Sequence, residues 1–193
     1  MTDPISVRTD QLVRLQAFET WTARLLGAWL PGVVDWDAKH QMAEHLWEDL
    51  QHARDLRTRL WELRVSRPDR HVAPSIETAA RQLGAATSDV AFIAGTYLVL
   101  LEALTVAYRN LLGDAHPIQD RPTVPLLERI LADKARQQDW GRATVQAWVT
   151  TGDKRREVDR WMRYAGEVLE ACGGIDGTRP ARPIARPLPG HPP

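Results

Sequence analysis

The sequence predicts an all-α fold, a bundle of long amphipathic helices, and two observations carry this prediction. No stretch sustains the alternation of apolar and polar residues that marks a half-buried strand, whereas long windows repeat apolar residues at spacings of three and four. Apart from Pro125, the prolines lie outside these windows rather than inside them. The fold class therefore follows from periodicity and from the positions of the helix breakers.

The first two long helices are marked by their ends. The first is predicted from about residue 11 to residue 30, where Pro31 and Gly32 stop it. The second is predicted from Asp37, a suitable N-cap, to about residue 65, and it ends before Pro68. Both carry one apolar stripe, so each is expected to bury one face against the rest of the bundle.

The remaining elements follow a longer connection, residues 66–88, which is predicted to hold one short helix over 75–83. A third long helix over 89–112 is apolar on most sides, as expected of an element surrounded by protein. A fourth is predicted over 123–149 and a fifth over 153–172. Four long helices with a longer connection between the second and third predict a four-helix bundle with one crossover, and the fifth helix packs beside it.

Length and composition set the domain organisation. A chain of 193 residues suffices for one domain, predicted over residues 1–174. Residues 175–193 are rich in proline and arginine and are predicted to form a disordered tail. The 25 basic residues equal the 25 acidic ones, which argues against nucleic-acid binding.

The same composition bears on location. The single cysteine, Cys172, cannot form an internal disulfide and fits a reducing cytoplasm. The apolar stretch from Val90 to Val106 is interrupted by polar residues and falls short of the roughly 20 apolar residues of a membrane span, so no membrane is expected.

Several charged and polar residues fall on faces that should be buried. Glu19 lies within the stripe of the first helix, and Asp49 lies in the middle of the stripe of the second, with His45 and His52 on its flank. Further exceptions follow in the later helices, namely Glu102 in the third and Lys134 and Gln137 in the fourth. A buried charge is costly unless it is paired, bound to metal or neutralised, so these residues are the candidate site.

Each candidate also has a structural interpretation. Glu19 could reach water at the end of the bundle, and His52 could be a partly exposed flank residue. Asp49 could form an ion pair with a neighbouring arginine, and Glu102 could pair with Arg109. Lys134 could run its stem along the core and place its ammonium in water.

The segment over residues 43–53, AEHLWEDLQHA, resembles the ligand-bearing second helix of the ferritin-like superfamily. Those bundles hold dimetal centres with a Glu from each of two helices and a Glu-x-x-His pair from each of the other two. The resemblance implies that Glu19 and Glu102 are metal ligands and that Asp49 and His52 form the acid-x-x-His pair.

The fourth helix departs from the family pattern. In the run over residues 130–137, ILADKARQ, Lys134 stands where the carboxylate is expected and Gln137 where the histidine is expected. An ammonium cannot ligate a cation while it keeps its proton, and Asp133 is one residue out of phase. The second metal position is therefore predicted to be damaged.

Three functional hypotheses follow. The first is a ferritin-like oxidase or oxygenase with a partial or mononuclear iron or manganese site formed by Glu19, Asp49, His52 and Glu102, acting on a small molecule. The second is a metal-free enzyme in which Lys134 and Asp49 act as acid and base. The third is a non-catalytic binding or scaffold protein with a degenerate site. The sequence leaves a homodimer open under each of them.

Overall fold

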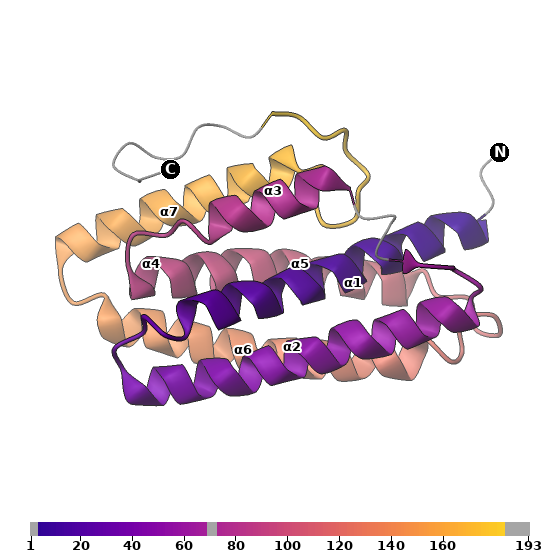
Figure 1. Ribbon diagram of the computed structural model, residues 1–193, viewed down its shortest axis with the longest axis horizontal. Coiled ribbons are helices and arrows are strands. Elements are labelled where there is room, and N and C mark those ends of the chain that lie inside the picture. Colours follow the sequence, from indigo (N-terminus) through magenta and orange to yellow (C-terminus); the bar gives the residue numbers. More distant parts are fainter. Residues whose placement is uncertain (1–3, 69–72, 184–193) are drawn as a thin grey trace.

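The computed structural model describes residues 4–68 and 73–183, and within these residues every regular element is helical (Figure 1). The prediction of an all-α fold is confirmed. The elements in chain order are α1 (Pro4–Trp29), α2 (Trp36–Glu62), α3 (Pro74–Leu83), α4 (Asp89–Ile93), the π-helix η2 (Ala94–Leu100), α5 (Leu101–Gly113), α6 (Val124–Trp148) and α7 (Gly152–Ala171).

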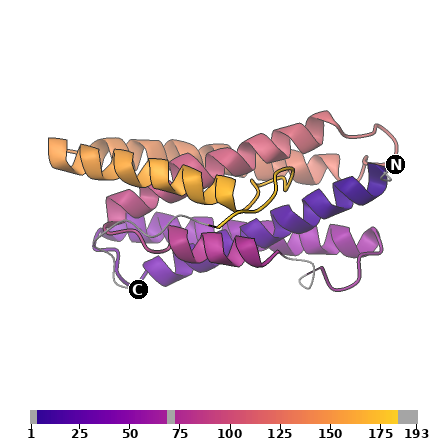
Figure 2. The same ribbon diagram turned by 90° about the horizontal axis from the view of Figure 1, so that it is seen from above.

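The helices are arranged so that α1 packs along α2, and α5 and η2 pack along α6 (Figure 1). Contacts between α2 and α6 and between α1 and α5 join the two pairs. The helices α3 and α7 contact each other and cover the side formed by α1 and η2 (Figures 1 and 2). One part of the core lies between α1, α2, α5 and α6, and it continues between these helices and α3 and α7.

Most helix ends agree with the sequence signals. The carboxylate of Asp35 accepts a hydrogen bond from the backbone N–H of Ala38 and caps α2, two residues before the predicted cap Asp37. Ser88 and Thr151 cap α4 and α7 in the same way. The start of α1 differs most, because this helix begins at Pro4 rather than near residue 11. Proline is tolerated in a first helical turn, so the polar residues before Gln11 extend the helix.

The third predicted helix contains a π-helical segment, η2, between α4 and α5. A π-helix bonds each N–H to the carbonyl five residues back, which the apolar pattern of this segment does not reveal. Two glycines mark close helix contacts here. Gly95 lies against the indole of Trp161 on α7, and Gly141 on α6 lies against Tyr97 of η2.

The continuous helix Asp89–Gly113 is long and apolar enough to cross a membrane by length and composition, which the sequence analysis did not expect. In the structure 72% of its most apolar window is buried inside the protein. Surrounding helices thus provide the apolar environment that this segment requires.

The chain after α7 folds back onto the helices. The guanidinium of Arg14 donates hydrogen bonds to the carbonyls of Gly174 and Ile175, and Ile175 is buried. The N–H of Arg182 donates to the carbonyl of Ala171 at 2.8 Å. The first part of the predicted disordered tail is therefore anchored, because α1 supplies partners for its carbonyls. Residues 184–193 of that tail lie outside the described residues.

The contact between Gly141 and Tyr97 generates a stability prediction. A Cβ added at Gly141 would overlap the Cβ of Tyr97, so Gly141→Ala should lower the free energy of unfolding by about 1–3 kcal/mol. Urea denaturation followed by circular dichroism measures this change. Gly166→Ala is the matched control, since nothing lies within 4 Å of a Cβ there and alanine favours a helix interior. Equal effects of the two substitutions would contradict the close packing of α6 on η2.

Candidate functional site

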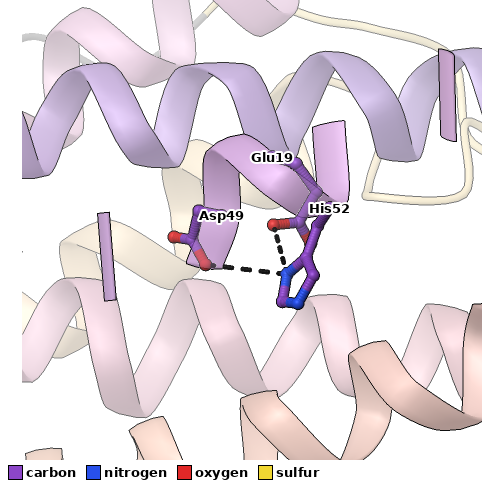
Figure 3. A group of neighbouring side chains, drawn as sticks. All are labelled: Glu19, Asp49 and His52. Carbon is purple, nitrogen blue, oxygen red and sulfur yellow. Dashed lines mark ion pairs between the residues drawn. The ribbon is translucent and has the colours of Figure 1, made fainter. Parts of the chain in front are cut away.

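Four charged or ionisable side chains from three helices meet in the core, and Figure 3 shows three of them, Glu19, Asp49 and His52. Glu19 comes from α1, Asp49 and His52 from α2, and Lys134 from α6. Glu19, Asp49 and Lys134 have no measurable exposure and His52 has 1%. The helical spacing of these residues places each on the inner face of its helix, so the sequence correctly located these four candidates.

The ammonium of Lys134 joins the two carboxylates. Its Nζ donates to Glu19 Oε2 at 2.8 Å and to Asp49 Oδ1 at 2.7 Å. Because Lys134 is fully buried, its ammonium does not extend along the core to water. The structural interpretations of Lys134 as a snorkelling residue and of Glu19 as a residue that reaches water are therefore wrong.

His52 closes the cluster on the other side. Its Nδ1 lies 3.4 Å from Glu19 Oε2 and 3.8 Å from Asp49 Oδ1, as the dashed lines in Figure 3 show. Its Nε2 lies 3.0 Å from Asp133 Oδ2. Asp133 is one residue out of phase with the inner face of α6, but it lies at the edge of that face and therefore reaches the histidine. The imidazole thus links the buried carboxylates to a partly exposed one.

Two further side chains complete the hydrogen bonding and were missed at the sequence level. The hydroxyl of Tyr108 on α5 donates to Glu19 Oε1 at 2.8 Å. The hydroxyl of Tyr97 on η2 lies 3.0 Å from His45 Nδ1, and both rings contact the indole of Trp140. Tyrosine in an apolar helix gives no sequence signal of a polar contact, because its ring already accounts for its burial.

Glu102 does not join the cluster, although the sequence analysis predicted it as a metal ligand. Its side chain is exposed and accepts a hydrogen bond from Gln138 Nε2 at 3.1 Å. The helix Asp89–Gly113 is apolar even on its outer side, where Val106 is 45% exposed, so the pattern could not identify the buried face. Tyr108, rather than Glu102, is the residue of this helix that reaches Glu19.

Gln137 donates hydrogen bonds at the position where the family resemblance requires a metal ligand. Its Nε2 donates to Asp49 Oδ1 and to Glu48 Oε2, each at 3.0 Å. Lys134 and Gln137 therefore direct N–H groups into the core at the two positions where a dimetal centre would need lone pairs. The residues of α6 do not fit a dimetal centre.

The environment separates the pKa values of the two buried carboxylates. Burial opposes ionisation of Glu19, yet the charge of Lys134 and the neighbouring imidazole of His52 hold its pKa at about 2. Burial raises the pKa of Asp49 to about 6, despite the attraction of Lys134, and the charge of Glu19 adds to this rise. Both oxygens of Glu19 have hydrogen-bond partners, while Asp49 Oδ2 has none among the described residues.

The neighbouring carboxylates raise the pKa values of Lys134 and His52. Burial acts to lower the pKa of Lys134, but the charges of Asp49 and Glu19 raise it above its ordinary value. Burial likewise acts to lower the pKa of His52, while its contacts with Glu19 raise it. Lys134 therefore holds its proton at neutral pH, which argues against its predicted role as a base.

Glu19, Asp49 and His52 could hold a metal ion, since one ligand atom of each lies within 4.8 Å of the others. Carboxylate oxygens and imidazole nitrogens suit divalent iron and manganese. The ammonium of Lys134 already binds two of these three ligands, so a metal ion could enter only if that ammonium moved away.

Comparison of the chain with protein-family models, curated proteins and solved structures gives no match. The function is therefore inferred from the geometry of the core and of the surface.

The buried imidazole of His45 generates a pH prediction. Burial, with the charges of Lys134 and Arg136, lowers its pKa to about 4. As the pH falls from about 7 to 4, the unfolded chain binds a proton at this histidine, whereas the folded chain binds it only near pH 4 because the pKa is lowered. His45 should therefore lower the free energy of unfolding by up to about 3 kcal/mol over this range.

Urea denaturation of the wild type and of His45→Gln at pH 7 and pH 4.5 measures this contribution. The variant should lose less stability than the wild type on acidification. Parallel losses would contradict a neutral buried His45, and so would an imidazole that titrates near pH 6.5 by NMR.

Proposed function

We propose that this chain is a ferritin-like four-helix bundle with one crossover, in which a lysine ammonium takes the place of a core metal. Support comes from the contacts among α1, α2, α5 and α6 and from the long connection that separates α2 from α4. In this proposal the protein is a non-catalytic interaction module, the third of the hypotheses raised by the sequence.

The observation that carries this proposal is the position of Lys134 Nζ, at 2.8 Å from Glu19 Oε2 and 2.7 Å from Asp49 Oδ1. An ammonium at hydrogen-bond distance from two carboxylates attracts both, as a bound cation would. Lys134 supplies one positive charge against the two carboxylates, and His52 supplies the second when it is protonated, so the chain itself can balance this core without an exogenous ion.

Catalysis by the same groups is less well supported. A general acid or base works best when its pKa lies near the working pH, and the pKa of Lys134 is moved away from neutrality. Substrate would also have to reach side chains that are fully buried. A structural network accounts for both features, since buried ion pairs can define which packing arrangement a core adopts.

A second candidate, a mononuclear iron or manganese site of an oxidoreductase acting on a small molecule, is favoured by one observation. Asp49 Oδ2 is buried and accepts no hydrogen bond from the described residues, although a carboxylate oxygen in that setting normally has a partner. In this candidate Glu19, Asp49 and His52 are the ligands, and the metal supplies Lewis-acid or oxygen-activating chemistry.

Metal analysis separates the two candidates. Protein purified with iron and manganese present should contain no stoichiometric metal, because Lys134 holds the carboxylates. Lys134→Ala should bind about one metal ion per chain, and Lys134→Ala combined with His52→Ala should bind none. About one metal ion per wild-type chain, lost in His52→Ala alone, would overturn the proposal in favour of the mononuclear site.

Stability tests whether the network is structural. Lys134→Met should lower the free energy of unfolding by roughly 3–5 kcal/mol, because it leaves Glu19 and Asp49 unpaired. Replacing all three residues, as Glu19→Met, Asp49→Leu and Lys134→Met, should recover most of this loss, apart from about 1–3 kcal/mol for the hydroxyl of Tyr108. Chemical denaturation measures both variants. A triple variant no more stable than the single one would contradict a purely structural network.

A further inference from the structure

The outer face of α2 exposes large apolar side chains. Trp36 is 75% exposed, Trp47 62%, Leu50 42% and Trp61 54%. These are four of the seven large apolar residues that the described part of the chain exposes most. Exposed apolar side chains gathered on one element mark an interaction surface, whereas isolated ones need no explanation.

The four residues belong to a regular stripe along the helix. We name it the outer α2 stripe, and its residues are Trp36, His40, Ala43, Trp47, Leu50, Arg54, Arg57 and Trp61. Successive members are separated alternately by four and three residues, which is the heptad spacing of helices that pair along their length. The buried residues Met42, His45, Asp49 and Leu56 lie on the opposite side of α2. One face of this helix therefore packs in the core, and the other is available to a partner.

We propose that the outer α2 stripe binds the same stripe of a second copy of this chain, with the two helices antiparallel. The two-fold axis passes between Trp47 and Leu50, near the middle of the helix. A closed two-fold pair uses one patch twice, and heptad spacing lets that patch be complementary to itself. The proposal concerns only the surface and is independent of the function proposed for the core.

The antiparallel register pairs side chains of complementary size. Trp47 faces Leu50 of the second copy, and the axis repeats this pair, so the centre of the interface is apolar. Trp36 faces Trp61 of the second copy at each end. Tryptophan clusters of this kind are enriched among the residues that dominate binding energy in interfaces.

Charge decides between the antiparallel and the parallel arrangement. In a parallel pair Arg54 would face Arg54 of the second copy, and two guanidinium groups would be buried together at a cost. In the antiparallel pair Arg54 faces the small Ala43 and comes beside Glu44 of the second copy. Arg54 is exposed, and among the described residues its guanidinium pairs with Asp55 of its own helix. Glu44 is also exposed, so both side chains can turn towards a partner.

The flank next to the stripe agrees with this register. Its residues are Asp37, Glu44, Gln51 and Thr58, one heptad apart. Antiparallel helices bring equivalent flanks together, so Glu44 faces Gln51 of the second copy and Asp37 faces Thr58. Each carboxylate then meets a neutral hydrogen-bonding side chain, and no like charges are opposed along this flank.

Sedimentation equilibrium of the full chain over a range of concentrations tests the proposal. The wild type should be a dimer that dissociates on dilution, and Trp47→Glu should be a monomer because it places a charge at the apolar centre. Ile118→Glu is the matched control, since Ile118 is 78% exposed in the loop between α5 and α6 and should leave the dimer unchanged. Circular dichroism checks that each variant remains folded.

A charge exchange tests the register. Arg54→Glu should raise the dimer dissociation constant about tenfold, and so should Glu44→Arg, because each places like charges together. Combining the two substitutions should restore the wild-type constant in an antiparallel dimer. A wild type that stays monomeric at about 1 mM would overturn the proposal, and the stripe would then belong to a different partner. A double variant as weak as the single ones would overturn the antiparallel register.

Discussion

The contact on which the core depends is the ammonium of Lys134 held between the carboxylates of Glu19 and Asp49. It joins α6 to α1 and α2 through two charged hydrogen bonds. Removing the lysine would leave both carboxylates without this partner, and an unpaired buried charge costs several kcal/mol. The surrounding donors, Tyr108 and Gln137, complete the same network from α5 and α6.

Much of this core could be predicted from the sequence. Helical periodicity places Glu19, Asp49 and Lys134 inward because each interrupts an otherwise apolar stripe, and an interruption is visible without any structure. Proline and glycine also mark most helix ends, because both residues are unfavourable in a helix interior. It was also predictable that Lys134 and Gln137 are poor metal ligands, because this depends on residue chemistry rather than on position.

Contacts that no polar residue in an apolar stripe marks could not be predicted from the sequence. Glu102 was misplaced because its helix is apolar on the outside as well as the inside, so its buried face has no marker. The π-helical turns of η2 give no pattern either. Tyr108 reads as an apolar core residue, although its hydroxyl binds Glu19. The anchored start of the C-terminal segment depends on Arg14, which is distant in the chain.

The two faces of α2 divide the protein into an inner network of charges and an outer apolar stripe. In the inner network the protonated ammonium of Lys134 occupies the position of a cation. The most direct measurement is ¹⁵N NMR of the Lys134 side chain between pH 6 and pH 9. A slowly exchanging ammonium signal that does not titrate is the result predicted. A signal that titrates to the neutral amine in this range, or that is displaced by added manganese, would contradict the account.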